Sequence, residues 1–273
     1  MTADDRALPE AAVKEALKVR ALAERLARAA GAVQREKYGT DIEIRTKSAA
    51  VDLVTEVDHE CEALIVGSLH AERSGDAILA EEGRGDDREG ARWRWIIDPI
   101  DGTTNYAHAY PRFCVSIGVE LEGERAIGVV YDPLLDELYS AVRGEGATLN
   151  GRPIRVSGET DLGNALVATG FAYDVRRSSR DNIDHFIAFV KRSRAIRRDG
   201  SAALDLCYVA AGRFDGYWEL KLHAWDVAAG LLMVEEAGGR VSDLSGGPAQ
   251  RSGFECIASN GRVHDQMLAI LRS

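Results

Sequence analysis

The 273-residue sequence predicts an α/β (α+β) fold, and three features of its pattern support this prediction. The chain opens with a long amphipathic segment, continues with short apolar segments separated by tight turns, and alternates strands with helices after Ser157. Strands joined by tight turns pair in antiparallel fashion, whereas alternation with helices is typical of α/β units. We therefore predict an N-terminal α+β unit at residues 1–155 and a C-terminal α/β unit at residues 156–273.

The first unit begins with a helix expected over Pro9–Tyr38, because proline suits a first turn and Gly39 follows as a terminator. Its apolar face carries Leu17, Leu22, Leu26 and Val33. An alternating segment at residues 41–47 predicts a strand, and a second helix follows at residues 59–72. The later strands of this unit are expected at Ala77–Ala80, Trp93–Ile97, Phe113–Leu121, Ala126–Tyr131 and Glu137–Val142. The last three should pair in antiparallel fashion, and an Asn-Gly pair at residues 150–151 indicates a hairpin.

The second unit alternates strands and helices without a low-complexity linker before it, so we expect the two units to pack tightly. Its strands are expected at Leu166–Ala168, Ala195–Arg197, Phe214–Leu220 and Glu255–Ala258. Its helices are expected at Asp181–Arg192, Ala202–Ala211, Val227–Ala237 and His264–Leu271.

Composition and charge narrow the classes of function. A net charge of −10, from 34 basic and 44 acidic residues, argues against binding to the phosphate backbone of nucleic acids. The four cysteines form no CxxC pair, so a thiolate zinc site is not expected, and buried free thiols suit a reducing compartment. The sequence begins without an apolar leader and holds no apolar run of membrane-spanning length. We therefore expect a cytoplasmic protein without a membrane or nucleic-acid partner.

The most informative segment is Trp95–His108, WIIDPIDGTTNYAH. Asp98 comes where an apolar strand ends, and Pro99 cannot continue the strand ladder. The resulting turn would bring Asp101 close to Asp98 and aim the Ile100 carbonyl inward. Two carboxylates held this close repel each other, and a hard divalent cation such as Mg²⁺ relieves the repulsion.

Gly102-Thr103-Thr104 then opens a helix or helical turn whose free N–H groups can bind an anion. The segment can therefore hold a metal through Asp98 and Asp101 and a phosphate through the amides of Gly102 and Thr103. The plainer interpretation of the same residues is an Asx-type turn that caps a helix.

Three other segments supply polar side chains that could join Asp98. They are Glu81 and Glu82 after the strand AILA, Asp226 after Trp225 at the start of an apolar helix, and Lys47, Asp52, Thr55 and Asp58 ahead of another helix. Their plainer interpretations are, in turn, a solvated loop, a helix N-cap and a solvated helix start.

Together these segments make the chain similar to the inositol monophosphatase family of lithium-sensitive, Mg²⁺-dependent phosphatases. The similarity extends from Lys47 to the C-terminus and includes DPIDGTTN, WDVAAG followed by EEAGG, DLVTEVD and AEE. The segment RRDGSAALDLCYVAAGRFDGYWE most resembles bacterial members. The resemblance implies a layered αβαβα sandwich of the inositol monophosphatase/fructose-1,6-bisphosphatase type, two or three Mg²⁺ ions per active site, and a homodimer.

The resemblance also implies the metal ligands. Glu81, Asp98, the Ile100 carbonyl and Asp101 would share a first metal, and Asp98, Asp101 and Asp226 would hold a second. Positions near a weaker third metal, or in contact with the site, correspond to Lys47, Asp58 and Glu82. Ala80 is a departure, because many relatives have glycine there; it should matter little unless the backbone needs a positive φ.

The roles in catalysis follow from the same resemblance. Glu81, with Thr103 nearby, would orient and deprotonate the attacking water, and the amides of Gly102 and Thr103 would bind the phosphate. Glu219 matches a carboxylate that bonds inositol hydroxyls. The residues that line the substrate pocket in relatives correspond to Gly200, Ser201 and Ala202.

The implied function is hydrolysis of a small phosphate monoester, with myo-inositol monophosphate as the first choice, by a phosphoric monoester hydrolase. Relatives with these motifs hydrolyse fructose 1,6-bisphosphate, 3′-phosphoadenosine 5′-phosphate or histidinol phosphate. Arg194, Arg197 and Arg198 could bind a second phosphate, or they could be a solvated rim. A third alternative is a regulatory binding partner of the transcription machinery, because some bacterial relatives act in this way.

Overall fold

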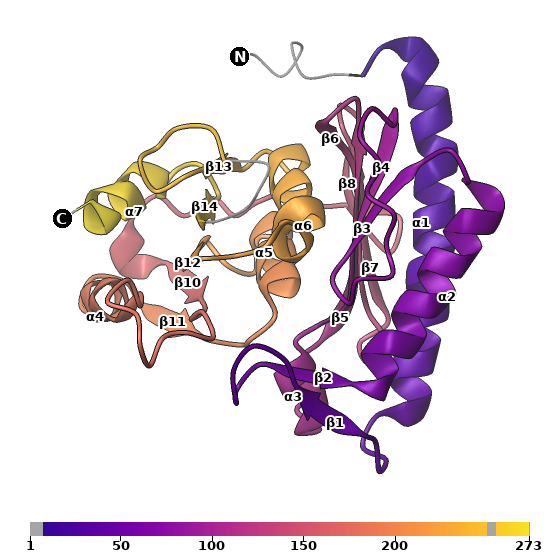
Figure 1. Ribbon diagram of the computed structural model, residues 1–273. Helices are drawn as coiled ribbons and strands as arrows, with labels where there is room; N and C mark the ends of the chain where they lie inside the picture. Colours follow the sequence, from indigo (N-terminus) through magenta and orange to yellow (C-terminus); the bar gives the residue numbers. More distant parts are fainter. Residues whose placement is uncertain (1–7, 250–254, 273) are drawn as a thin grey trace.

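Two large β-sheets and three pairs of helices build the fold in the computed structural model, which describes residues 8–249 and 255–272. Residues 1–7, which belong to the acidic N-terminus, lie outside this description. Helices α1 (Glu10–Lys37) and α2 (Glu56–Glu72) cover one face of the larger sheet, as Figure 1 shows. None of the helices in the described ranges is long and apolar enough to cross a membrane.

The other helices complete the layers. Between the sheets lie α5 (Ala202–Ala210) and α6 (Ala224–Glu236). Beyond the smaller sheet lie α4 (Ile183–Val190) and α7 (His264–Leu271). The order of layers is therefore helix, sheet, helix, sheet, helix, which confirms the αβαβα sandwich (Figure 1).

The larger sheet has seven strands in the order β3-β4-β5-β6-β7-β8-β9. Their bounds are Ala77–Ala80, Trp93–Asp101, Cys114–Leu121, Glu124–Asp132, Glu137–Val142, Gly146–Leu149 and Arg152–Pro153. Strands β3 and β4 are parallel, and the others pair in antiparallel fashion, as predicted for β5 to β7. Asn150 and Gly151 form the expected hairpin with φ of 50° and 75°, because this turn needs two positive φ angles.

The smaller sheet has five strands in the order β11-β10-β12-β14-β13. Their bounds, in that order, are Ala195–Arg197, Leu166–Thr169, Gly216–Leu220, Glu255–Ser259 and Arg240–Ser242. A separate hairpin pairs β1 (Ile44–Thr46) with β2 (Leu53–Thr55), and a short helix α3 spans Thr103–Ala107. The sequence pattern did not predict β13, because a three-residue strand with a mostly accessible surface has too little alternation to detect.

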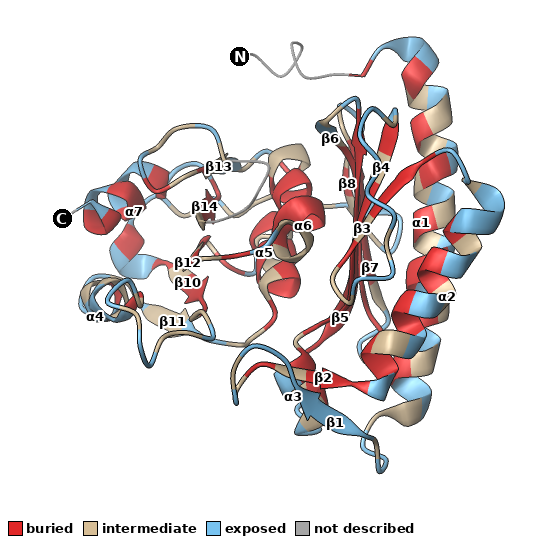
Figure 2. Ribbon diagram, viewed as in Figure 1, coloured by how far each residue is buried: buried red, intermediate tan, exposed pale blue. Residues whose placement is uncertain are grey.

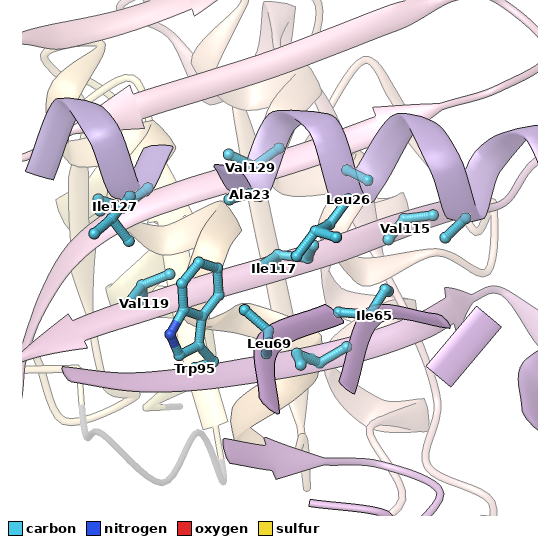
Figure 3. Close-up of a cluster of buried hydrophobic side chains, with 14 of the residues drawn as sticks. Ala23, Leu26, Ile65, Leu69, Trp95, Val115, Ile117, Val119, Ile127 and Val129 are labelled. Carbon is cyan, nitrogen blue, oxygen red and sulfur yellow. The ribbon is translucent and has the colours of Figure 1, made fainter. Parts of the chain in front are cut away.

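The main core lies between the larger sheet and helices α1 and α2. Figure 3 shows Leu26 and Leu69 reaching from the helices towards Trp95 and Ile117 on the strands. Figure 2 shows that the sheet-facing side of α1 is buried while its outer side is exposed. The buried stripe of α1 is rich in alanine, and of the predicted apolar face only Leu26 is fully buried. Small side chains bring the helix close to the sheet, so Leu17, Leu22 and Val33 pack only at its margin.

Helix α6 also lies unusually close to the larger sheet. A Cβ atom added to Gly118 on β5 would lie 2.6 Å from the Ala228 Cβ, and one added to Gly128 on β6 would lie 2.5 Å from the Ala229 carbonyl oxygen. Only glycine permits this approach of backbone to helix. Because α6 carries Asp226 in its first turn, these two glycines help to position that carboxylate near the strands.

Candidate active site

Four carboxylates from three separate parts of the chain meet at one end of β3 and β4. Glu81 follows β3 directly, and its amide donates to the Ile97 carbonyl at 3.2 Å, which places it beside the next residue, Asp98. Asp101 lies further along β4, and Asp226 lies in the first turn of α6. The charges of Glu81, Asp101 and Asp226 all act on Asp98, so the fold brings these side chains together.

The sequence predicted a strand that ends at Ile97, but β4 is longer than predicted. It continues to Asp101 through a bulge, in which Asp98 pairs with Ser116 and Asp101 pairs with Cys114. The bulge forms because Pro99 has no amide hydrogen for the ladder. The Ile100 amide donates to Asp98 Oδ1 at 3.0 Å, so an Asx-type turn is present, but it lies within the acidic cluster.

Burial and mutual repulsion disfavour ionisation of the three aspartates in this cluster. Asp98 and Asp101 are 3% and 7% exposed. Burial raises the pKa of Asp98 well above its usual value, and the neighbouring charges of Glu81 and Asp101 raise it further. Burial likewise raises the pKa of Asp226, and it raises that of Asp101 to about 6 against the opposing hydrogen bonds. Such a cluster is stable as anions only beside positive charge.

The donor set fits a hard divalent cation, since it consists of buried or partly buried carboxylates and a nearby backbone carbonyl. Within residues 8–249 and 255–272, however, no three His, Cys, Asp or Glu side chains already converge as metal ligands. The carboxylates interact through their charges while individual oxygens accept hydrogen bonds from the protein. The chemistry of the cluster therefore suits Mg²⁺, although its oxygens are not aligned on one point.

Asp101 is held by the start of α5. Its Oδ2 accepts from the Ser201 hydroxyl at 2.7 Å and the Ala203 amide at 2.6 Å, and its Oδ1 accepts from the Ala202 amide at 3.3 Å. A helix N-terminus favours a carboxylate because its first amides lack acceptors within the helix. Ser201 and Ala202, which the resemblance placed at the substrate, thus also contact a proposed metal ligand.

Lys47 supplies a positive charge at the edge of the cluster. Its Nζ lies 2.8 Å from Glu81 Oε1 and also contacts Glu82 Oε1. Burial disfavours the charged ammonium, but the charges and hydrogen bonds of Glu81 and Glu82 outweigh this effect and raise the pKa of Lys47. Asp58 is fully buried and caps α2 by accepting from the Thr55 amide at 2.8 Å. Asp58 is therefore not a solvated residue at a helix start, and Lys47, although exposed, is paired with two carboxylates.

Asp226 is not the N-cap of its helix. His223 holds that position, and Asp226 Oδ2 accepts from the His223 amide at 2.6 Å. The imidazole ring of His223 stacks on Trp225 with 4.7 Å between centroids, which restrains the start of α6. Asp226 therefore has a capping interaction and also belongs to the acidic cluster.

The turn from β4 into α3 adopts the conformation expected of the motif. Gly102 has a φ of 99°, and an added Cβ would lie 2.8 Å from the Arg112 carbonyl oxygen, so only glycine fits. The Thr103 hydroxyl contacts Asp58 Oδ1 at 3.1 Å and the Ile100 carbonyl at 3.0 Å. Thr103 is thus bonded to groups other than Glu81, the partner that the resemblance implied.

Glu219, on β12, faces the same region. The Tyr217 hydroxyl donates to Glu219 Oε2 at 2.6 Å. Burial raises the pKa of Glu219 to about 7, Tyr217 and Arg198 oppose this rise, and Asp101 adds to it. Protein atoms surround the carboxylate, although part of the residue remains accessible. Its position suits recognition of a hydroxyl group near Asp101.

Two nearby residues had no signal in the sequence. Tyr173 lies in an irregular loop and is 49% exposed, but desolvation of its phenol by surrounding protein atoms and the charges of Glu81 and Asp226 raise its pKa. Arg112 lies between α3 and β5 with a buried guanidinium group. Neither position belongs to a periodic pattern, so only the tertiary structure relates them to the site. Arg194 and Arg197 lie exposed, and each donates to a group outside the acidic cluster.

A cavity of about 760 Å³ lies away from this site, along the strand edge that includes Arg94. Arg94 is paired there with Asp87 at 2.7 Å and with Glu120 at 3.3 Å. Because these charges already neutralise one another, we do not assign this cavity to the reaction.

Comparison with known proteins finds relatives that match most of the chain. The model of the inositol monophosphatase family matches residues 15–273. A protein named inositol-1-monophosphatase from Synechocystis sp. is 44% identical over 239 residues, which cover 88% of this chain and 83% of that protein. A Nus factor SuhB from Pseudomonas aeruginosa is 42% identical over 258 residues, covering 92% of this chain and 94% of that protein. The solved structure of inositol monophosphatase from Anabaena (Nostoc) matches with a TM-score of 0.85 and 40% identity, covering 94% of this chain and 96% of that one.

Proposed function

Because the chain belongs to the inositol monophosphatase family, we propose that it hydrolyses a small phosphate monoester to an alcohol and inorganic phosphate, with myo-inositol monophosphate as the preferred substrate. The main support is the meeting of Glu81, Asp98, Asp101 and Asp226 in one acidic cluster, in which Asp98 and Asp101 are buried and the other two are partly exposed. Burying repelling carboxylates destabilises a fold, so their presence is best explained by a positively charged cofactor, which could in turn bind an anionic substrate.

The proposed cofactor is Mg²⁺, two or three ions per site. Glu81, Asp98, the Ile100 carbonyl, Asp101 and Asp226 would hold it. When bound, magnesium neutralises the carboxylates, polarises the phosphate oxygens and makes coordinated water more acidic. The net charge of −10 is therefore compatible with an anionic substrate.

The chain's own residues would perform the remaining steps. Glu81, which the Lys47 ammonium holds at 2.8 Å, would accept a proton from the attacking water. The water oxygen forms a new bond to phosphorus while the bond from phosphorus to the alcohol oxygen breaks, and the departing oxygen takes up a proton from solvent to give the alcohol. The amides of Gly102 and Thr103 would bind the phosphoryl oxygens, on which negative charge accumulates. No side-chain nucleophile is needed.

Glu219 would select a polyol. Its carboxylate lies close enough to Asp101 for the two charges to interact, and hydroxyl groups are natural donors to it. A second phosphate site for fructose 1,6-bisphosphate has less support, because Arg194 donates to Asn164 Oδ1 at 3.1 Å and Arg197 donates to a backbone carbonyl. Arg198, the third of these arginines, lies near Glu219 and opposes the rise of its pKa. We therefore propose inositol phosphate ahead of the bisphosphate on the strength of Glu219.

A second candidate function is binding to the transcription machinery. The observation in its favour is that several relatives at 41–42% identity, each matched over 92% of this chain, are named Nus factor SuhB. A pull-down with wild-type and Asp98→Asn protein separates the two functions. A transcription-machinery partner that the variant retains would support a role independent of hydrolysis, whereas its absence with both proteins would argue against that role.

The homodimer and the cytoplasmic location also belong to this proposal. Light scattering coupled to size-exclusion chromatography tests the first. A dimer has twice the 29.7 kDa mass of the chain, and a peak at the monomer mass would contradict it.

The decisive experiment is a phosphate-release screen with Mg²⁺ over inositol phosphates, fructose 1,6-bisphosphate, nucleotide phosphates and histidinol phosphate. We expect inositol monophosphate to be the best substrate. Asp98→Asn should lose nearly all turnover while retaining a wild-type circular dichroism spectrum. Turnover of Asp98→Asn close to wild type at saturating Mg²⁺ would overturn the assignment.

A further inference from the structure

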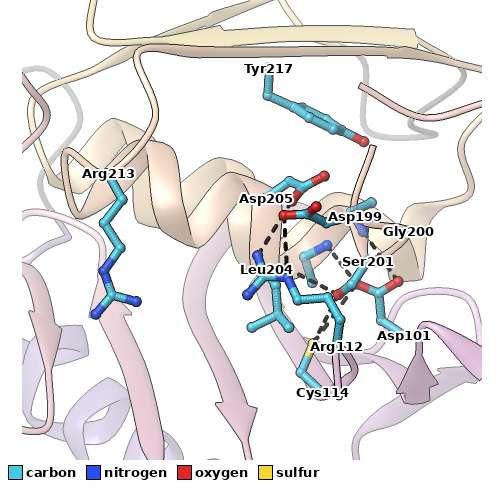
Figure 4. Close-up of polar contacts among 12 residues, drawn as sticks. Asp101, Arg112, Cys114, Asp199, Gly200, Ser201, Leu204, Asp205, Arg213 and Tyr217 are labelled. Carbon is cyan, nitrogen blue, oxygen red and sulfur yellow. Dashed lines mark hydrogen bonds and ion pairs between the residues drawn. The ribbon is translucent and has the colours of Figure 1, made fainter. Parts of the chain in front are cut away.

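We propose that Arg112 is a positioning residue that holds the start of α5 against Asp101 and thereby sets the affinity of the site for magnesium. This inference rests on the proposed function, because it treats Asp101 as a magnesium ligand. It concerns a side chain that Figure 4 shows near Asp101, Ser201 and Asp205.

The guanidinium of Arg112 is buried among groups of the second unit. Its side chain is 9% exposed, and its Nη2 lies 3.5 Å from Asp205 Oδ1. Its Nε lies 3.8 Å from Asp199 Oδ2, and the guanidinium carbon lies 4.0 Å from the centroid of the Tyr208 ring. Figure 4 shows Arg112 reaching towards Asp205 from the side of Asp101 and Cys114. The residue therefore joins the larger sheet to α5 across the interior.

The two acids that Arg112 attracts flank the donors to Asp101. Asp199 precedes Ser201 by two residues, and Asp205 follows it by one helical turn. Ser201 and the amides that follow it are the groups that bind Asp101, at distances down to 2.6 Å. A displacement of this first turn would therefore move or release the Asp101 carboxylate.

Asn105 holds the same region through the backbone. Its Nδ2 donates to the Arg112 carbonyl at 2.7 Å and to the Asp199 carbonyl at 2.8 Å. Asn105 and Arg112 thus fix the Asp199–Ser201 segment by two independent attachments. Only the Arg112 attachment depends on charge.

The contacts of Arg112 are electrostatic and shape-dependent. Distances of 3.5 and 3.8 Å are long for hydrogen bonds, and within the described residues Arg112 Nε makes none. Burial raises the pKa of Asp205, and the guanidinium opposes that shift. Removal of Arg112 alone would leave a buried, uncompensated carboxylate, so a single substitution would confuse positioning with stability.

A paired substitution separates the two effects. In Arg112→Met/Asp205→Leu both charges are replaced by apolar groups, which often preserves stability at a buried ion pair. We expect Arg112→Met to lower the unfolding midpoint and the double variant to recover it. Substitution of a residue that orients a metal ligand changes metal affinity by about 10-fold to 100-fold. We therefore expect the Mg²⁺ dissociation constant of both variants to rise by roughly tenfold. Calorimetry without substrate measures it.

Arg213→Gln is the matched control. Its guanidinium carbon lies 4.6 Å from the centroid of the same Tyr208 ring, but its ion pair is with Glu137 on β7, away from the start of α5. We expect Arg213→Gln to bind Mg²⁺ with wild-type affinity. Wild-type affinity in the stable double variant would overturn the inference.

The same titrations separate failure of this inference from failure of the proposed function. If wild-type protein binds no Mg²⁺ in calorimetry and releases no phosphate, the proposed function fails. If wild-type protein binds Mg²⁺, Asp98→Asn does not, and Arg112→Met/Asp205→Leu matches wild type, only the role of Arg112 fails.

Discussion

At the residue scale, buried aspartates in this chain have two different environments. Asp76 accepts hydrogen bonds from Arg73 Nε at 2.7 Å and from Trp95 Nε1 at 2.8 Å, so a cation and a neutral donor compensate its charge. Asp98 lies among other carboxylates, which raise its pKa in addition to the effect of burial. Compensated burial is typical of a structural role, whereas uncompensated burial indicates a functional site.

The proposed role of Glu219 can be tested at the same scale. Glu219→Gln keeps the shape of the side chain but removes the charged acceptor for a substrate hydroxyl. A hydrogen bond to a charged group contributes about 1.5–3 kcal/mol, so we expect KM for inositol monophosphate to rise roughly tenfold or more. Steady-state kinetics with p-nitrophenyl phosphate, which has no polyol, provides the control and should change little. An equal effect on both substrates would contradict the role in selecting a polyol.

At the element scale, the approach of α6 to the larger sheet decides where Asp226 lies. The glycines of β5 and β6 allow this approach, and the stacked His223 and Trp225 restrain the start of the helix. Helix α5 acts in the same way on Asp101 through its first amides. The positions of the proposed ligands Asp226 and Asp101 thus depend on the placement of α6 and α5 as well as on local sequence.

Gly118→Val tests the placement of α6. An added Cβ lies 2.6 Å from the Ala228 Cβ, and overpacking of this kind costs about 1–3 kcal/mol of unfolding free energy. We expect a lower urea midpoint and a larger proportional loss of phosphate release, because Asp226 moves with the helix. Gly67→Ala is the control, since Gly67 is an exposed position of α2 with open space around it. It should raise stability by up to about 1 kcal/mol and leave activity unchanged. Full activity in Gly118→Val would show that Asp226 does not need this close contact.

At the scale of the whole molecule, His264 makes the free energy of unfolding depend on pH. This residue lies outside the acidic cluster. Its Nε2 lies 2.9 Å from Ser242 Oγ and its Nδ1 lies 2.9 Å from Ser259 Oγ, so the buried ring joins α7 to β13 and β14. Burial lowers the pKa of His264 to about 4, the charge of Arg240 adds to this effect, and Asp265 opposes it. The folded protein therefore keeps this ring neutral where the unfolded chain would protonate it.

The sign of the pH dependence follows from this difference. Below the ordinary histidine pKa the unfolded chain gains a proton that the folded chain does not, so unfolding becomes more favourable as pH falls towards 4. Between about pH 7.5 and about pH 5 we expect His264 to contribute a loss of about 2 kcal/mol in unfolding free energy. Urea unfolding of wild type and His264→Gln at both pH values measures how the unfolding free energy of each protein changes with pH. The difference between these two changes isolates the contribution of His264 from that of the carboxylates. Equal changes in the two proteins would contradict the prediction.

The sequence alone was sufficient for the type and order of most elements. Apolar periodicity located α1, α2 and the strands β3 to β7, because each of these segments alternates or repeats over its own length. The Asn-Gly hairpin at residues 150–151 was predictable because its turn requires positive φ at both positions. The end of β4 was predicted too early, since a bulge around Pro99 depends on the partner strand β5 as well as on β4.

The local sequence also determined which residue types lie at the proposed active site. The motif DPIDGTTN contains two carboxylates and a glycine with a φ of 99°, and a turn of this kind can be recognised without long-range information. Only the tertiary structure decided that Glu81, Asp98, Asp101 and Asp226 lie together and that Arg112 reaches Asp205. The physical reason is that side-chain periodicity is a property of neighbouring residues, whereas the meeting of distant carboxylates depends on packing between helices and sheets, which no single segment contains.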